Sequence, residues 1–326
     1  MGGHRCRYLA RLTFAAAAMA LLAGCGETRA GPGPAPGGEP GDGAMPAGPP
    51  AATASPPNLD TALAHWGSFP ATVTPRPIVA LDELPVPQDG FATDPAKLAF
   101  ACRQIDAAIV RYPATPDRAT LRWPDGTATE HRPLAAKDAV AAIDDAGPPT
   151  NVDCAGVAPV RITGIKLGET TLRTDRGLVT ATGWTFTGPD VRGDGLSYPA
   201  IHEDRYWGFA PELRAGQLVA TEVAADGRRL TAYFYGTPTN AGACTSEYEA
   251  IVAESPAAVA IALRTLPPAQ PPPTDVACAE IAQLRTLTVS LAGPLGGRVV
   301  VDEQGGVTPV CPAGRIDSQA TGTPAC

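Results

Sequence analysis

The sequence lacks the short motifs by which many enzymes are recognised. It has no G-x-S-x-G, no H-E-x-x-H, no Walker loop and no G-x-G-x-x-G after an expected strand. Histidine is scarce, with 4 residues in 326. Ser197 is the nearest glycine-flanked serine, but nothing in its spacing from His202 brings the two side chains together. The sequence therefore indicates no catalytic residues, no cofactor and no metal site.

A basic excess is also missing. The chain has 25 Lys and Arg residues against 33 Asp and Glu residues, which gives a formal net charge of −8. The basic residues form no cluster, and this argues against binding to nucleic acid or electrostatic adhesion to anionic lipid. Asp190 and Asp194 lie near a turn, but they lack the regular spacing of oxygen ligands found in a calcium loop.

The apolar run near the N-terminus is too short to span a membrane. Leu12–Ala23 is uncharged and mostly apolar over 12 residues, whereas a spanning helix needs about 20. Arg5, Arg7 and Arg11 supply positive charge at its start, with no acidic residue nearby. This pattern predicts a signal peptide over residues 1–24.

The residues Leu22-Ala23-Gly24-Cys25 directly follow this run and resemble the bacterial lipobox. The resemblance implies that Cys25 receives a diacylglycerol on its sulfur and that cleavage follows Gly24. Two acyl chains suffice for stable anchoring at about 0.8 kcal/mol per buried methylene. The alternative is an ordinary signal peptide cut near Ala23, which leaves Cys25 as half of a disulfide. We expect a protein held by lipid on the extracytoplasmic face of a bacterial cell membrane.

A stretch rich in proline and glycine follows the cysteine. Residues 26–57 include 9 prolines and 8 glycines in 32 positions and contain no aromatic residue. Such a composition cannot bury enough apolar surface to offset its conformational entropy. Residues 25–57 are therefore expected to form the attachment cysteine and a disordered tether, with a rough end-to-end distance of ~30 Å.

The remaining cysteines favour disulfides. Six are left once Cys6 in the signal and Cys25 are set aside, and no two show CxxC spacing. An even number in an exported chain indicates a disulfide framework rather than metal ligation. Six cysteines allow 15 connectivities. We expect sequence neighbours to pair, which gives Cys102–Cys154, Cys244–Cys278 and Cys311–Cys326.

The clearest helical pattern starts at Asp94. Asp94 is suited to cap a helix, Pro95 suits its first turn and Pro113 would end it. The apolar stripe of this helix consists of Leu98, Cys102, Ile105 and Ile109. A weaker helical pattern covers about residues 135–145.

Short strands separated by turn signals are expected elsewhere. The Pro-Asp-Gly turn at 124–126 lies between two extended runs, and Asp226-Gly227 is the strongest hairpin signal. One strand alternates cleanly, with Leu287, Val289 and Leu291 on one face. In another, we expect Leu178, Trp184 and Phe186 to share a face.

This pattern predicts a mainly β fold with a minor helical part (α+β), built from antiparallel, sandwich-like sheet and stapled by disulfides. We expect an N-terminal α+β domain over 58–210 and a C-terminal antiparallel β domain over 211–326.

A second resemblance covers roughly residues 154–310. The segments TTLRTDRGLVTATGWTF, LTAYFYG, YEAIVAES and LRTLTVSLAGPLGGRVVVDE are similar to a module of uncharacterised secreted lipoproteins of actinobacteria. The resemblance implies architecture and an extracytoplasmic habitat but no activity. It also implies that Cys244 and Cys278 pair across adjacent strands.

The densest cluster of polar and aromatic residues is HEDRYWGF at 202–209. It contains the candidate ligand-facing residues His202, Glu203, Arg205, Tyr206 and Trp207. The alternative is a junction between two subdomains, with the aromatic side chains packed and the charges solvated.

The leading hypothesis is a non-enzymatic binding or envelope-accessory module with an unknown envelope ligand or protein as its partner. An envelope hydrolase is the alternative, and it would need His131 or His202 beside a carboxylate or serine in a pocket. A structural spacer would need neither.

Labelling with palmitate tests the anchor. Wild-type protein should incorporate the label, whereas Cys25→Ser should not, because the acceptor sulfur is gone. Labelling that survives the substitution would contradict the assignment of Cys25.

Overall fold

The computed structural model describes residues 59–107, 111–145, 152–208, 218–267, 278, 281–316 and 326. The predicted signal peptide, Cys25 and the predicted tether lie outside the described residues. Within the described ranges, no helix is long and apolar enough to cross a membrane. The predicted fold class is confirmed, because the described chain is mainly strand with few helices.

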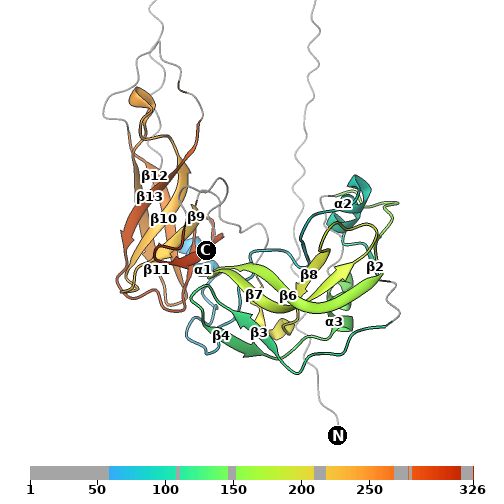
Figure 1. The fold of residues 1–326 in the computed structure, drawn as a ribbon. Helices are drawn as coiled ribbons and strands as arrows, with labels where there is room; N and C mark the ends of the chain where they lie inside the picture. Colours follow the sequence, from blue (N-terminus) through green and yellow to red (C-terminus); the bar gives the residue numbers. More distant parts are fainter. Residues whose placement is uncertain are drawn as a thin grey trace, which may run out of the picture. The chain divides into compact units, whose positions relative to one another are not determined.

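The first half of the described chain is built around a sheet in the order β1-β8-β7-β3-β4, with β6 also paired to β7. All of its pairings are antiparallel. Two helices, α2 (Asp94–Ala101) and α3 (Ala136–Asp145), and a small parallel sheet of β2 and β5 accompany it (Figure 1). The strands are β1 (Val86–Pro87), β2 (Ile105–Ala107), β3 (Ala119–Arg122), β4 (Ala128–His131), β5 (Val160–Ile162), β6 (Gly164–Thr174), β7 (Gly177–Thr187) and β8 (Leu196–Pro199).

The first part of strand β7 packs one face of the strand in a hydrophobic core, and the second part packs the opposite face in another core. Val179 and Ala181 pack in one core, whereas Trp184 and Phe186 pack in a second core. Successive residues of a strand point to opposite sides, so Val179 and Ala181 lie on one face of the sheet and Trp184 and Phe186 on the other. Leu178 does share a face with Trp184 and Phe186, as predicted, because the pairing of β7 with β6 keeps one register along the whole strand. At the Leu178 end of the strand, however, this face is not covered, and Leu178 is exposed.

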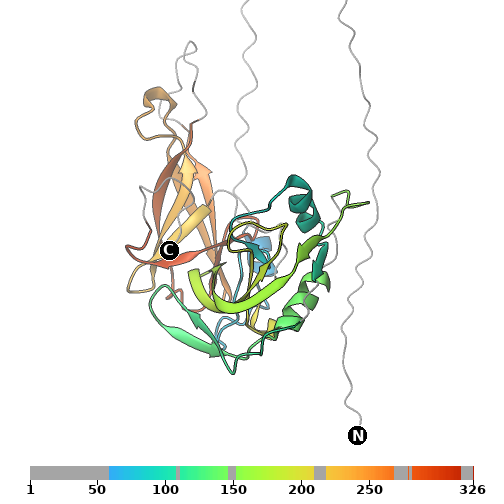
Figure 2. The same cartoon turned by 45° about the vertical axis from the view of Figure 1, so that its right-hand side comes forward.

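The second half is a β-sandwich of two four-stranded sheets, in the orders β13-β10-β9-β16 and β11-β12-β14-β15. Figures 1 and 2 show β9, β10 and β13 side by side in orange and brown tones. Phe234, Ile261 and Val300 meet in the core between the sheets. The strands are β9 (Leu218–Val223), β10 (Arg229–Gly236), β11 (Tyr248–Glu254), β12 (Ala258–Thr265), β13 (Gln283–Ser290), β14 (Val299–Val301), β15 (Val307–Thr308) and β16 (Val310–Pro312).

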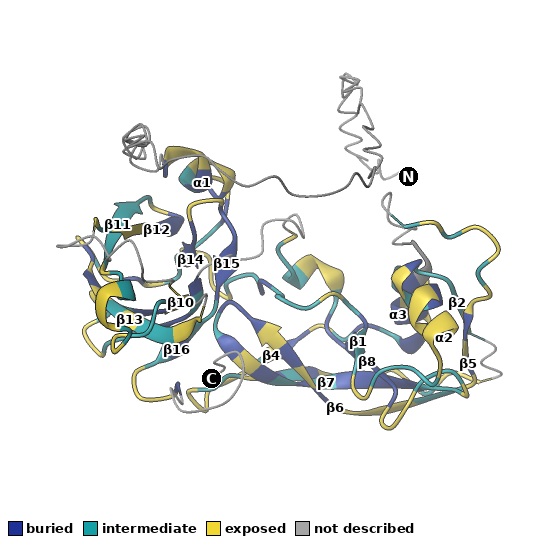
Figure 3. Cartoon of the chain, turned by 90° about the horizontal axis from the view of Figure 1, so that it is seen from above, coloured by how far each residue is buried: buried dark blue, intermediate teal, exposed yellow. Residues whose placement is uncertain are grey.

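The second sheet of the sandwich is buried on both faces. In β12, Val259 and Ile261 face the other sheet, whereas Ala260 packs under the N-terminal segment. Helix α1 (Asp60–His65) and Trp66 belong to that segment. A strand covered on both sides is apolar throughout, and Figure 3 shows β14 and β15 in the colour of buried residues.

The start of the described chain thus packs on the sandwich rather than on the sheet that follows it in sequence. Trp66 is fully buried, and its Nε1 donates a hydrogen bond to the carbonyl of Gly305 at 2.9 Å. The domain boundary near residue 210 stays a prediction. The segment 59–69, however, shares a hydrophobic core with strands of the sandwich and so belongs with the predicted C-terminal domain.

The predicted helix from Asp94 to Pro113 is much shorter in the structure. Helix α2 covers Asp94–Ala101, and Thr93 rather than Asp94 caps it by accepting a hydrogen bond from the Ala96 amide. The chain then enters β2, where Ile105 pairs with Val160 of β5. Tertiary strand pairing overrides the helical pattern here.

The predicted apolar stripe of that helix is accordingly wrong in part. Cys102 is buried as expected, but Leu98 is 41% exposed and Ile109 lies outside the described residues. Helix α3 (Ala136–Asp145) matches the weaker prediction. The hairpins predicted at 124–126 and 226–227 are both present, as is the buried face of Val289 and Leu291.

Three disulfides join sequence neighbours, as expected from the cysteine positions: Cys102–Cys154, Cys244–Cys278 and Cys311–Cys326. One detail of the resemblance is wrong, since Cys244 and Cys278 do not lie on adjacent strands. Cys244 lies in the 3-10 turn between β10 and β11, and Cys278 follows β12 outside any strand.

A buried ion pair connects the sheet to the segment before it. Arg76 forms a two-pronged pair with Asp175 in the turn between β6 and β7. The Arg76 and Asp175 side chains are 9% and 2% exposed. Arg76 Nε also donates to the carbonyl of Gly297 in the sandwich at 2.6 Å. One guanidinium therefore joins residues from three parts of the fold.

We expect Asp175→Asn to lower the free energy of unfolding by about 3 to 5 kcal/mol, because it leaves the buried Arg76 charge without a counter-ion. Chemical denaturation measures the loss. Glu130→Gln is the matched control, since Glu130 pairs with Arg118 on the exposed surface and should matter little. Equal losses in the two variants would contradict the assigned role of the buried pair.

Candidate functional site

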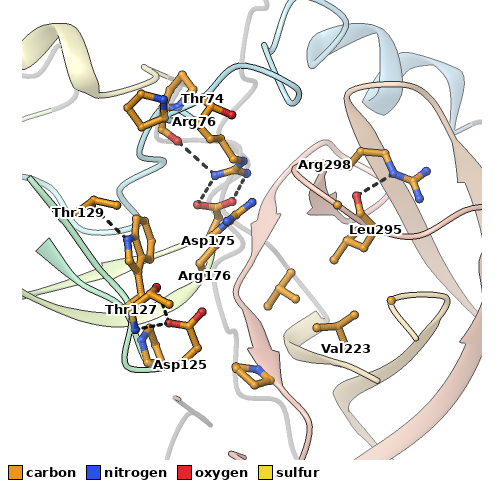
Figure 4. A pocket seen from close by; sticks show the side chains of 18 of the residues that line it. Thr74, Arg76, Asp125, Thr127, Thr129, Asp175, Arg176, Val223, Leu295 and Arg298 are labelled. Carbon is orange, nitrogen blue, oxygen red and sulfur yellow. Dashed lines mark hydrogen bonds and ion pairs between the residues drawn. The ribbon is translucent and has the colours of Figure 1, made fainter. Parts of the chain in front are cut away.

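A cavity of about 490 Å³ lies between the first sheet and the sandwich. On the sheet side, its walls are the segment 74–77, the β3–β4 hairpin and the β6–β7 turn. On the sandwich side, they are the β9–β10 hairpin, the loop before β14 and strand β16 (Figure 4). Ligand cavities of this size are common where two structural units meet.

The β3–β4 hairpin holds Trp123 and Asp125 at the edge of the cavity. The Asp125 carboxylate accepts hydrogen bonds from the amide and the hydroxyl of Thr127 at 2.8 and 2.7 Å. These bonds lower the pKa of Asp125, so its carboxylate is ionised near neutral pH. Trp123 Nε1 donates to the hydroxyl of Thr129 at 3.3 Å, which holds the indole in place.

The sandwich side of the cavity is mostly apolar, with Val223, Leu295 and Val310 among its residues. Arg298 is charged, but Glu254 pairs with it at 2.6 Å. The guanidinium also donates to backbone carbonyls, including that of Leu295 at 3.1 Å. Glu254 and these carbonyls, which all belong to the sandwich, therefore compensate the charge of Arg298.

Arg176 differs from the other arginines of the cavity. Its side chain makes no hydrogen bond and no ion pair with any residue that the structure describes. Burial lowers the pKa of Arg176, and the positive charge of Arg76 lowers it further, whereas Asp175 and Asp125 act in the opposite direction. Arginine remains charged in proteins, so Arg176 presents a positive charge to the cavity.

Among the described residues, His131 is the only histidine that lines this cavity, and it is 8% exposed. Its Nε2 lies 2.8 Å from the hydroxyl of Thr129. Burial lowers the pKa of His131, and the charge of Arg205 lowers it further, so the ring is neutral at pH 7. In the described part of the chain, no carboxylate or serine forms a hydrogen bond with this ring.

None of the five residues predicted as a ligand-facing cluster lines the cavity. His202 caps the 3-10 turn Glu203–Arg205, and Arg205 donates to the carbonyl of Pro75. Trp207 packs edge-on against Phe69 at 5.4 Å between ring centroids.

Tyr206 packs with the core under the first sheet, and burial raises the pKa of its hydroxyl. Tyr206 pairs with Ile78 in a parallel bridge. The Ile78 amide donates to the carbonyl of Arg205, and the Trp207 amide donates to the carbonyl of Ile78. Tyr206 and Trp207 thus pack against the protein, and the role of this cluster toward a ligand stays a prediction.

The other sequence candidates do not converge on a site. Ser197 bonds to Gln88 and Val86, away from His202, and Asp190 pairs with Arg161. Among the described residues, no group of three or more His, Cys, Asp or Glu side chains could hold a metal ion.

Sequence reasoning identified the hairpin that carries Trp123 but not the cavity beside it. Trp123 and Arg176 lie 53 positions apart in the chain, and the sandwich wall comes from residues beyond 222. No local pattern brings these segments together. Comparison of the chain with protein-family models, with curated proteins and with solved structures gave no match.

The lowered pKa of His131 predicts a pH-dependent contribution to stability. The unfolded chain binds the proton more readily than the folded one, so protonation favours unfolding. Stability should rise with pH from the lowered pKa of the folded state up to about 6.5 and gain nothing further above it.

His131→Gln should therefore lose less stability than the wild type between pH 7.5 and pH 5. Denaturation midpoints at both pH values measure the difference, with the exposed His65→Gln as the comparison variant. The same pH dependence in the wild type and in His131→Gln would refute the assignment.

Proposed function

We propose that this protein is a lipid-anchored extracytoplasmic binding module whose cavity holds a small envelope ligand. The lipobox-like residues before Cys25 and the proline- and glycine-rich stretch after it support the anchor. The three disulfides are consistent with an oxidising compartment outside the cytoplasm.

The observation that carries the binding function is the cavity itself. Its volume of about 490 Å³ suits a small molecule. Its walls combine apolar side chains, such as Trp123 and Leu295, with a few polar groups, among them Arg176. Apolar walls provide affinity, whereas a few fixed polar groups provide orientation and specificity.

The geometry favours binding over hydrolysis. A hydrolase of the serine type needs a nucleophile next to a histidine and a third group that orients the histidine. His131 contacts the hydroxyl of Thr129, but that hydroxyl also accepts a hydrogen bond from Trp123. No carboxylate among the described residues bonds to the ring to complete such a triad. The acidic composition also supports a partner other than nucleic acid.

Filling the cavity tests the binding function. Ala224 lines the cavity, so Ala224→Trp should block it, whereas Ala243→Trp adds the same side chain at an exposed position. The proteins are purified from native envelopes and denatured, and the released small molecules are analysed by mass spectrometry. We expect molecules on the wild type and on Ala243→Trp that are at least about tenfold depleted on Ala224→Trp.

Thermal unfolding verifies that both variants are folded. An identical set of molecules on all three proteins, or none on the wild type, would refute binding in this cavity.

A further inference from the structure

The charged side chains that line the cavity differ in whether a carboxylate is paired with them. From the part of the chain that the structure describes, three guanidinium groups reach it, those of Arg76, Arg176 and Arg298. Arg76 is paired with Asp175, and Arg298 is paired with Glu254. Arg176 alone of these three has no hydrogen-bonded counter-ion among the described residues.

A guanidinium that is partly withdrawn from water without a partner favours an oxyanion. Its planar fork of N–H groups matches the two oxygens of a carboxylate or of a phosphate ester. The positive charge of Arg76 also lowers the pKa of Arg176, so the charged form of Arg176 is disfavoured by this neighbour as well as by burial. A negative group placed at Arg176 would relieve both effects.

The acidic residues of the cavity limit the charge of the ligand. Asp125 is ionised, because Thr127 hydrogen bonds lower its pKa, and it faces the same cavity as Asp175. The Asp175 charge is already matched by Arg76. A second negative charge on the ligand would therefore meet carboxylates instead of a further unpaired cation.

The remaining walls suit an apolar body. Four of the described prolines line the cavity, and proline has no backbone N–H that could bind an anion. The indole N–H of Trp123 is engaged with Thr129, so this ring offers contact area rather than a hydrogen bond. Val223, Leu295 and Val310 complete the apolar surface.

We propose that the cavity selects amphipathic small molecules that carry one singly charged oxyanion, a carboxylate or a phosphodiester, which binds Arg176 while the apolar body packs against Trp123. This assignment rests on the proposed binding function and specifies its ligand class. Arg176 is the specificity-determining residue, and Trp123 contributes affinity without regard to charge.

Probes of equal shape and different charge test this assignment. Calorimetric titration compares 2-naphthoate with 2-naphthamide, and diphenyl phosphate represents the phosphodiester. The full chain carries Cys25→Ser, so that no acyl chains or detergent interfere. We expect 2-naphthoate or diphenyl phosphate to bind roughly 10- to 100-fold more tightly than the neutral amide.

Variants separate the charge from the apolar walls. Arg176→Gln should abolish the preference for the anion and leave the affinity for 2-naphthamide within about twofold, whereas Arg176→Lys should retain part of it. Arg118→Gln, which removes an exposed arginine outside the cavity, should change neither. Trp123→Leu should weaken the acid and the amide alike.

The outcomes distinguish the two proposals. An anion preference that persists in Arg176→Gln overturns the ligand class but not the binding function. The same conclusion follows if the wild type binds the amide as tightly as the anion and Ala224→Trp abolishes this binding: the ligand class is then overturned, but the binding function is not. Binding of neither probe, or binding that Ala224→Trp leaves intact, overturns both. Thermal unfolding of each variant excludes loss of the fold as the cause.

Discussion

The ion pair between Arg76 and Asp175 is the interaction on which the arrangement of the cavity depends. Both side chains are almost fully buried, and the backbone of Asp175 bonds to Val79 through its amide and to the Val310 amide through its carbonyl. The residue is therefore fixed by the preceding segment and by the sandwich together. Because Arg76 engages the Asp175 carboxylate in a two-pronged contact, the neighbouring Arg176 has no hydrogen-bonded carboxylate among the residues that the structure describes. The unpaired charge in the cavity is thus a consequence of the pair that holds its walls together.

A second connection between the sheet and the sandwich lies where the β6–β7 turn enters β7. The disulfide Cys311–Cys326 joins β16 to residue 326, whose carbonyl accepts a hydrogen bond from Leu178 at the start of β7. Gly177 lies between Arg176 and that bond with a φ of +93°, and a side chain there would collide with the Cys326 sulfur. Both walls of the cavity are therefore fixed before any ligand arrives. A site that is already organised loses less entropy on binding, which favours affinity in a cavity of modest size.

Local signals predicted the parts of this fold that local interactions determine. The turns at 124–126 and 226–227 and the alternation of Leu287, Val289 and Leu291 depend on neighbours in sequence, and the structure bears them out. The helix expected to reach Pro113 fails because Ile105 finds a strand partner 55 positions away in Val160. Leu178 lies on the predicted face with Trp184 and Phe186, but the alternation could not show that it is exposed, because β7 changes its buried face along its length. The cluster at 202–207 is prominent in the sequence because aromatic residues are few, yet Tyr206 and Trp207 are partly buried and pack against two cores. Arg176 has no local feature that would single it out in the sequence.

The same geometry couples occupancy of the cavity to stability. Arg176 is held partly out of water beside Arg76, and its lowered pKa reflects the cost of keeping it charged there. The unfolded chain carries no such cost, because both guanidinium groups are then hydrated. An oxyanion at Arg176 lowers the free energy of the folded state alone, so it stabilises the fold in proportion to the logarithm of its concentration. Arg176 therefore lowers the stability of the protein without an anion and would raise it when an oxyanion is bound. This relation is expected when a charge is retained for a ligand rather than for the fold.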